Sequence, residues 1–203
     1  MNITSTVARI WKPVNKGARA TAVILALLLA GSAHNAAATV YTLQIPCTQE
    51  WTDTGIDIAA GSLVGITASG TVQYGYLGEQ VTDANGGDYT GQQFFPTAVL
   101  PNTIIVSLIG KIGGSTAIDT GTPIPEGTFG KGPGFVGTSY SQVVSTGGRL
   151  FLGFNDQLGA YYDNYGSFSV NVSVVPEPST LALLIVPGAL LVARKVRRGR
   201  LAA

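Results

Sequence analysis

One short segment near the end of the chain gathers oxygen-bearing side chains at a spacing that could hold a metal ion. Residues 154–168 read FNDQLGAYYDNYGSF, with four Asn or Asp residues within ten positions. A turn needs only about one Asn or Asp for its geometry, whereas Ca²⁺ takes roughly six to eight oxygen ligands. Asp156, Asp163 and Asn164 offer such oxygens, and two glycines allow the backbone to curl. The segment therefore predicts a calcium site; the alternative is a solvated, Asx-rich hairpin loop without an ion.

Aromatic residues in the same region could contact a sugar. Tyr161, Tyr162 and Tyr165 lie within the segment, and their side chains can point either to solvent or to the core. Trp51 is expected in the core. A glycoside hydrolase needs two carboxyl groups flanking the scissile bond, and no motif in this chain selects such a pair. The one histidine, His34, falls in the expected N-terminal signal, so the remaining chain has no histidine for a catalytic triad or zinc site. We expect no enzymatic activity.

The elements that must position this segment are short strands separated by Gly, Pro, Asn and Asp. Residues 167–174 alternate cleanly, with every second residue apolar, and 149–154 form another β-rich run, so the segment is expected to be a hairpin loop between two strands. Residues 104–112 are the most apolar run and are predicted to form a central strand. Further strands are expected at 40–45, 63–68, 71–74 and 142–144, and no helix is. This pattern predicts an all-β domain, a β-sandwich or jelly roll, with long loops at 78–98 and 113–139 that are functional or mobile.

The segment and the residues before it resemble the PA-IL-like galactophilic lectins, small β-sandwich proteins that bind sugar through Ca²⁺. Upstream, WTDTGIDI at 51–58 followed by Ala60-Gly61 resembles the opening hairpin of the family, and ASGTVQYG at 68–75 and LIGKIG at 108–113 resemble its next two strands. The likeness covers roughly 44–175. It implies side-chain calcium ligands at Asp156, Asp163 and Asn164, and backbone carbonyl ligands at Tyr74 and Ala160.

The sugar site follows the family pattern less closely. The lectins use a His-Pro-Asp-Gln-like segment, where this chain reads GQQFFP at 91–96, without histidine. Gln92 or Gln93 could donate to a sugar hydroxyl. The expected sugar-binding residues are therefore Gln92, Gln93, Asp156 and Asp163.

Both ends of the chain read as export signals. Residues 1–38 combine basic residues, a short apolar run and an Ala-Ala-Ala site, which is typical of a signal peptide. Residues 176–203 run Pro-Glu-Pro, a 13-residue apolar stretch (181–193) and a basic cluster, and resemble the PEP-CTERM sorting signal. That resemblance implies processing by an exosortase-type membrane protease and delivery to the cell surface or exopolysaccharide matrix. The alternative is an ordinary transmembrane anchor, for which the stretch is short, since about 20 residues span a bilayer.

The domain between the signals, 39–175, is acidic. It carries ten acidic and three basic residues, an excess of seven negative charges, which argues against nucleic acid or an anionic membrane surface as partner. Cys47 is the one cysteine, so no intrachain disulfide forms; we expect a buried thiol, the alternative being an intermolecular disulfide.

Together these features predict an exported, calcium-binding and carbohydrate-binding, lectin-like surface or matrix protein. The first alternative is a structural matrix protein in which calcium only rigidifies the loop, and the second is a glycoside hydrolase.

Overall fold

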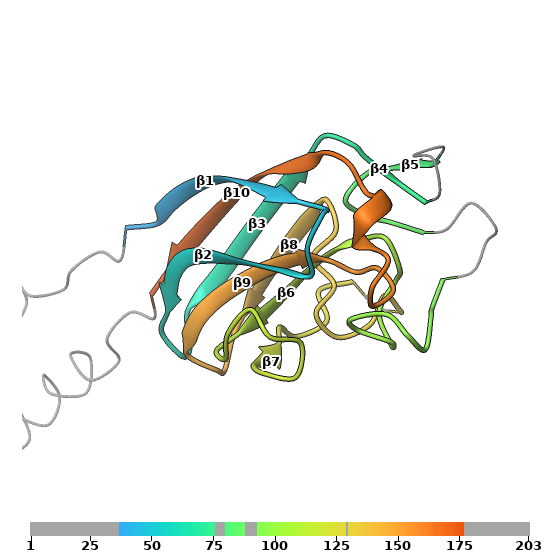
Figure 1. Ribbon diagram of the computed structural model, residues 1–203. Helices are drawn as coiled ribbons and strands as arrows, with labels where there is room; N and C mark the ends of the chain where they lie inside the picture. The colour runs from blue at the N-terminus through green and yellow to red at the C-terminus, as the bar shows by residue number, and fades with distance from the viewer. Residues whose placement is uncertain (1–36, 76–79, 88–92, 129, 177–203) are drawn as a thin grey trace, which may run out of the picture. The chain divides into compact units, whose positions relative to one another are not determined.

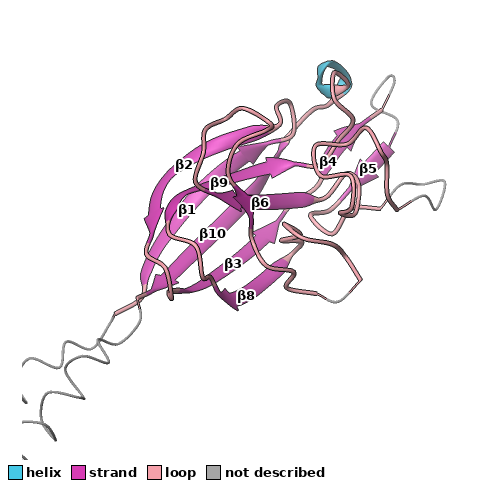
Figure 2. Cartoon of the chain, turned by 90° about the horizontal axis from the view of Figure 1, so that it is seen from below, coloured by secondary structure: helices cyan, strands magenta, loops and turns pink. Residues whose placement is uncertain are grey.

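Two four-stranded antiparallel sheets form the computed structural model, and they pack face to face as a β-sandwich (Figure 1). The first sheet has the order β1-β10-β3-β8 (Thr39–Pro46, Ser167–Val175, Leu63–Ser69, Ser139–Val143). The second has the order β2-β9-β6-β7 (Trp51–Ile58, Gly148–Phe154, Leu108–Ile112, Thr122–Pro123). A two-stranded ribbon, β4 (Val72–Tyr74) with β5 (Gln80–Thr82), extends beyond one end of the sandwich (Figure 2). The all-β prediction is confirmed.

The structure describes residues 37–75, 80–87, 93–128 and 130–176. The signal peptide and sorting signal expected at the two ends of the chain lie outside these ranges, apart from residues 37–38 and Pro176. Within the described ranges, no helix is long and apolar enough to cross a membrane.

The core forms because each sheet turns one apolar face inward. In β10 the alternate residues Phe168, Val170 and Val172 are fully buried, as the period of two in the sequence predicts. They face the second sheet, where Leu152 and Phe154 of β9 are also fully buried. The rings of Phe154 and Phe168 meet across the sheets with centroids 6.2 Å apart. Complete burial of such a side chain contributes about 1.5–3 kcal/mol, so these layers hold the sandwich together.

Three sequence-based expectations about single elements are wrong. The segment after Phe154 is not a hairpin loop, because β9 and β10 belong to different sheets and the segment crosses between them. The strand at 51–58, β2, and the turn after it do not form a hairpin, because the next strand, β3, belongs to the other sheet. The apolar run at 104–112 is strand only from Leu108; its first four residues are buried but turn away from the sheet.

Asn155 explains why residues 104–107 of that run do not join the strand. Its buried side-chain amide donates to the carbonyls of Leu100, Thr103 and Ile104 at 2.9–3.2 Å, and its Oδ1 accepts from the amide of Leu100 at 2.9 Å. These bonds give the backbone of residues 100–104 an alternative to ladder pairing, so a β-prone apolar sequence becomes a buried turn.

Candidate functional site

The candidate site lies at the end of the sandwich where β9 finishes, in the segment 155–166 that crosses from β9 to β10. Figure 1 shows this segment, in orange, at the same end as β4 and β5. Two neighbouring stretches hold its backbone. Gln73 of β4 exchanges two backbone hydrogen bonds of 2.9 Å with Tyr165. The backbone carbonyl of Asp156 accepts from the amide of Val99 at 3.1 Å. Segments far apart in the sequence therefore meet around the crossing segment.

Tyr161 fixes the turn from inside. It lies in η2 (Tyr161–Asp163), a single 3-10 turn, and its ring is buried. Its hydroxyl donates to the carbonyl of Phe154 at 2.7 Å and accepts from the amide of Asp156 at 3.3 Å. Burial raises the pKa of this phenol above its usual value, so the hydroxyl remains a donor at neutral pH. The position of Asp156 is thus set by both the strand end and the Tyr161 ring.

Asp156 and Asn164 form the buried centre of the site. Both residues are 7% exposed. Asn164 donates its amide nitrogen to Oδ2 of Asp156 at 2.9 Å and to the carbonyl of Cys47 at 3.0 Å. Because both partners are acceptors, the nitrogen must face them, and this fixes the amide orientation. Oδ1 of Asn164 then points away from them, buried, and has no donor among the described residues.

This orphaned oxygen differs from the other buried polar atoms without a partner. Those atoms are the indole nitrogen of Trp51 and the hydroxyls of Ser62 and Tyr140. Each of these atoms can donate a hydrogen bond. Asn164 Oδ1 is an acceptor only, and it belongs to a side chain bonded to a buried carboxylate. A cation in contact with this oxygen would remove the cost of leaving it without a partner.

The carboxylate of Asp156 is destabilised in its charged form. Burial raises its pKa, hydrogen bonds from Asn164 and Gln157 (2.7 Å to Oδ1) lower it, and the nearby charge of Asp163 raises it again, with burial the largest effect. Among the described residues, no cationic side chain contributes to this balance. Within the described part of the chain, the site is therefore electron-rich, partly dehydrated and without a compensating positive charge.

The predicted calcium ligands lie in the crossing segment and in β4, whose Gln73 pairs with that segment. Asp163, half-buried, ends η2 next to Asn164, and half-buried Ala160 lies just before η2. Tyr74 is buried in β4 and follows Gln73, which bridges to Tyr165. Within the described ranges, no three His, Cys, Asp or Glu side chains come together as a metal-binding group. The available donors are instead two carboxylates, one amide oxygen and backbone carbonyls, which is the hard-oxygen set that Ca²⁺ accepts.

The predicted sugar-contacting glutamines are placed less definitely. The Gln93 side chain is exposed, and its carbonyl accepts from the amide of Ile105 at 2.9 Å. The residues after Gln93 contact the crossing segment, since the backbone carbonyl of Thr97 accepts from the amide of Leu158 at 2.9 Å. Gln92 lies outside the described residues. Asp156 and Asp163 therefore lie in the same segment, while Gln93 lies on a neighbouring stretch with its side chain exposed.

The three tyrosines of the crossing segment differ in their exposure to solvent. Tyr161 is buried, whereas Tyr162 is 81% exposed and Tyr165 is 74% exposed. Trp51 is buried, as expected, and so is Cys47, whose thiol donates to the carbonyl of Gly166 at 3.3 Å. Burial raises the pKa of the Cys47 thiol to about 11.

Two residues that support the site are not marked by their type or spacing in the sequence. Asn155 is one of four Asx residues in the segment, and nothing in its spacing marks it as the buried anchor of residues 100–104. Val106 has a φ of 53°, a left-handed conformation rare for a β-branched residue, and its amide donates to the carbonyl of Asn155 at 2.6 Å. Glycine would have marked this position, but the sequence has a buried valine.

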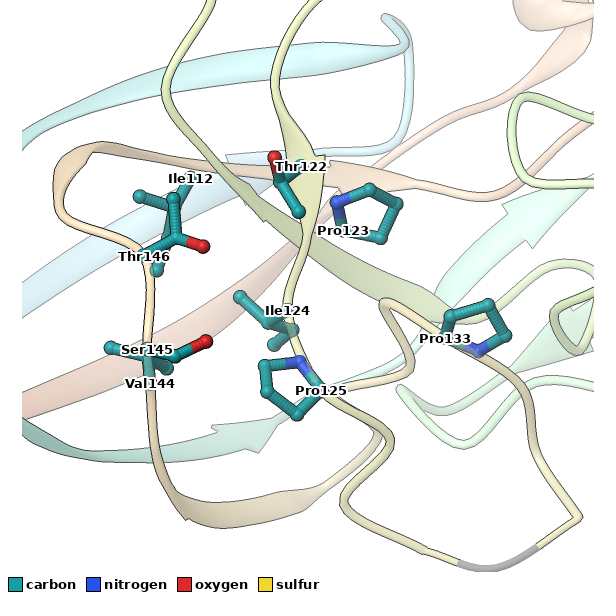
Figure 3. Close-up of a pocket in the computed structure, with 9 residues that line it drawn as sticks. All are labelled: Ile112, Thr122, Pro123, Ile124, Pro125, Pro133, Val144, Ser145 and Thr146. Carbon is teal, nitrogen blue, oxygen red and sulfur yellow. The ribbon is translucent and has the colours of Figure 1, made fainter. Parts of the chain in front are cut away.

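A separate pocket of about 220 Å³ lies near the far end of β6 (Figure 3). Ile112, which lines it, ends β6, while Leu108 at the other end pairs with Phe154, just before Asp156. Its lining is apolar or hydroxyl-bearing and contains no ionisable side chain: Ile112, Thr122, Pro123, Ile124, Pro125, Pro133, Val144, Ser145 and Thr146. It therefore offers no acid–base pair for glycoside hydrolysis.

Comparison with known proteins finds likeness among solved structures only. No protein-family model matches the chain, and no curated protein matches it. Among solved structures, the chain is similar to the N-terminal domain of EclA, described as a PllA-like lectin. The identity is 24%, the match covers 66% of this chain and 95% of that one, and the TM-score is 0.37. A likeness at this level says nothing about ligands, so the donors of the site are the basis for assigning its chemistry.

Proposed function

We propose that this protein binds Ca²⁺ at Asp156, Asp163 and Asn164 and uses the ion to bind carbohydrate outside the cell. The observation that carries the proposal is the buried Oδ1 of Asn164, which has no donor although its side chain is held in place by two hydrogen bonds. The backbone carbonyls of Tyr74 and Ala160 complete the proposed ligand set.

The chemistry of the donors favours calcium over a transition metal. The site offers carboxylate, amide and carbonyl oxygens, and the described residues have no imidazole and one thiol, Cys47, whose raised pKa of about 11 keeps it protonated. The buried Asp156 carboxylate has no cationic partner among the residues that the structure describes, so the ion would supply a compensating charge. When bound, the ion would supply a Lewis-acidic point that accepts two vicinal hydroxyl groups of a sugar.

The protein residues then have separate tasks. Asp156 and Asn164 hold the ion at a position fixed by Tyr161 and Cys47, and Asp163 adds negative charge at the rim. Gln93, exposed on the neighbouring stretch, is proposed to donate to a sugar hydroxyl and tune selectivity. Gln92 is proposed for the same role.

Export gives this binding site its setting. The expected signal peptide and the PEP-CTERM-like tail imply secretion, handling by an exosortase-type protease and a final place on the cell surface or in an exopolysaccharide matrix. The excess of acidic residues in 39–175 suits a compartment in which divalent cations are plentiful.

A second candidate function has an observation in its favour. Asn155 and Tyr161 already tie the crossing segment to the sandwich by several buried hydrogen bonds. Such rigidity suits a structural matrix protein in which Ca²⁺ only stabilises the segment and no sugar binds.

One experiment separates the two functions. Purified protein is applied to a glycan array in Ca²⁺ and in EDTA, and Ca²⁺ affinity is measured by calorimetry on the same sample. Glycan binding that requires Ca²⁺ supports the proposal. Calcium affinity without binding to any glycan supports the structural role, and glycan binding unchanged in EDTA contradicts a calcium-mediated sugar site.

A further inference from the structure

Two exposed tyrosines flank the proposed ligands and have no role in holding the ion. Tyr162 precedes Asp163, and Tyr165 follows Asn164; their side chains are 81% and 74% exposed. They are the most exposed of the described tyrosines, since Tyr41 is 39% exposed and Tyr74, Tyr140 and Tyr161 are all below 9%. The two outward rings therefore need a separate explanation.

Both rings rise from backbone that is held in place. The amide and carbonyl of Tyr165 are each bonded to Gln73 of β4 at 2.9 Å. Tyr162 is the middle residue of η2, directly after Tyr161, whose ring and hydroxyl are buried. A tyrosine on a fixed backbone has few torsions left to order, so it offers contact area at low entropic cost.

The surface continues from Tyr165 across the β4–β5 ribbon. Gln73 is the partner of Tyr165 on one side and of Val81 in β5 on the other, and directly paired residues share a face of a sheet. All three side chains are exposed, Val81 at 59%, while Val72, Tyr74 and Thr82 on the opposite face are buried. Tyr162 is exposed in the same crossing segment as Tyr165, and we call Tyr162, Tyr165, Gln73 and Val81 together the tyrosine strip. It is apolar and amide-bearing and contains no charge.

The charge around the strip restricts what can lie on it. Asp163 follows Tyr162 directly and Asp156 lies in the same crossing segment, while the domain has three basic residues. Of these, Lys111 is buried at 2% exposure and Arg149 is paired with Asp53 and Asp57. Little positive charge is thus available to attract an anionic polymer, and a neutral one avoids repulsion from the carboxylates.

We propose that the tyrosine strip is a binding subsite for the neighbouring residues of a neutral oligosaccharide whose first sugar is held at the calcium site. The inference rests on the proposed function, because it assumes that a sugar reaches Asp156 and Asn164. The apolar face of a pyranose ring covers a tyrosine ring well, and the phenol hydroxyls and the Gln73 amide can bond sugar hydroxyls at the edge. The protein thereby favours chains over single sugars.

The test compares ligand lengths in matched variants. A glycan array of neutral hexose mono-, di- and tetrasaccharides identifies a hit, and calorimetry then measures the hit's monosaccharide and tetrasaccharide. Tyr162→Ala and Tyr165→Ala are each expected to lower tetrasaccharide affinity at least about fivefold and to leave monosaccharide and Ca²⁺ affinity unchanged. Tyr165→Phe keeps the ring and should retain most affinity. Tyr41→Ala, on β1 and 39% exposed, is the control and should change neither.

Each outcome has one reading. Selective loss for the tetrasaccharide supports the subsite. Unchanged tetrasaccharide affinity in both alanine variants, or equal loss for both ligand lengths, overturns it while leaving the calcium-dependent sugar site intact. A wild-type protein that binds no glycan, or binds one equally in EDTA, removes the proposed function itself and the subsite with it.

Discussion

Asn164 bonds Asp156 through its amide nitrogen, at 2.9 Å from Oδ2, and leaves its own Oδ1 buried with no donor in the described part of the chain. One side chain thus stabilises a buried carboxylate and supplies an unsatisfied acceptor beside it. In a protein interior such an acceptor costs about 1–3 kcal/mol unless a partner is provided. The proposed Ca²⁺ would be such a partner.

Asp163→Ala should remove most of the stabilisation that Ca²⁺ gives. Asp163 is half-buried at the rim, so the substitution deletes a charged oxygen donor without opening the core. Wild-type protein should gain about 2.7 kcal/mol in free energy of unfolding at a hundredfold excess of Ca²⁺ over its Kd. Urea denaturation with and without Ca²⁺ measures the gain. Asp119→Ala is the matched control, with the same change of charge at an exposed position, and a loss of the gain there too would point to net charge instead.

Asn155→Ala should destabilise the fold by about 2–4 kcal/mol, because it leaves several buried backbone groups of Leu100, Thr103 and Ile104 without partners. It should also weaken Ca²⁺ binding, since residues 97–99 contact the crossing segment. The midpoint of urea denaturation reports the first effect and calorimetry the second. Asn171→Ala, on the exposed face of β10, is the control and should stay within about 0.5 kcal/mol of wild type. Similar costs for the two variants would show that Asn155 is not an anchor.

The thiol of Cys47 should be unreactive in the folded protein. It is fully buried, donates to the carbonyl of Gly166 and has a pKa raised by burial to about 11, so almost no thiolate exists at neutral pH. A thiol-exchange reagent should label it only after denaturation. Rapid labelling of native protein, or a dimer that dissociates on reduction, would instead favour the intermolecular disulfide.

Glu126 should make stability fall in acid. Its Oε1 accepts from the amides of Lys131 at 2.8 Å and Gly132 at 3.0 Å. These bonds hold the pKa of Glu126 below its usual value, and the bond from Gly132 has the largest effect. A lowered carboxyl pKa contributes stability above the unfolded-state pKa and loses it as the pH falls through the folded-state pKa. The difference in Tm between wild type and Glu126→Gln should therefore shrink from neutral pH to about pH 3. A difference that stays constant over this range would show that the charge of Glu126 does not matter.

The sequence predicts the parts of this fold that depend on local pattern. The period of two in residues 167–174 gives both the strand and its buried face, and the runs at 63–68 and 149–154 are likewise confirmed as β3 and β9. What it does not reveal is which sheet each strand joins. A loop between consecutive strands reads alike whether it closes a hairpin or crosses between sheets, and the crossing after Phe154 is set by packing across the core.

The site shows the same division. The composition of the segment indicates its oxygen donors, but not which of them are buried. Adjacent tyrosines 161 and 162 lie in opposite environments: the buried Tyr161 hydroxyl donates to the carbonyl of Phe154, whereas the Tyr162 ring is 81% exposed. The turn at 104–107 was missed because its apolar residues favour a strand, while long-range bonds from Asn155 prevent one.

The central claim is that the folded protein binds Ca²⁺ through Asp156, Asp163 and Asn164. Thermal unfolding of wild-type protein in Ca²⁺ and in EDTA tests it most directly, because an ion that binds only the native state must raise Tm. We predict a higher Tm in Ca²⁺ that rises further with its concentration and is absent in Asn164→Ala. Unfolding curves of the wild type that coincide in Ca²⁺ and in EDTA would contradict the metal site and the function built on it.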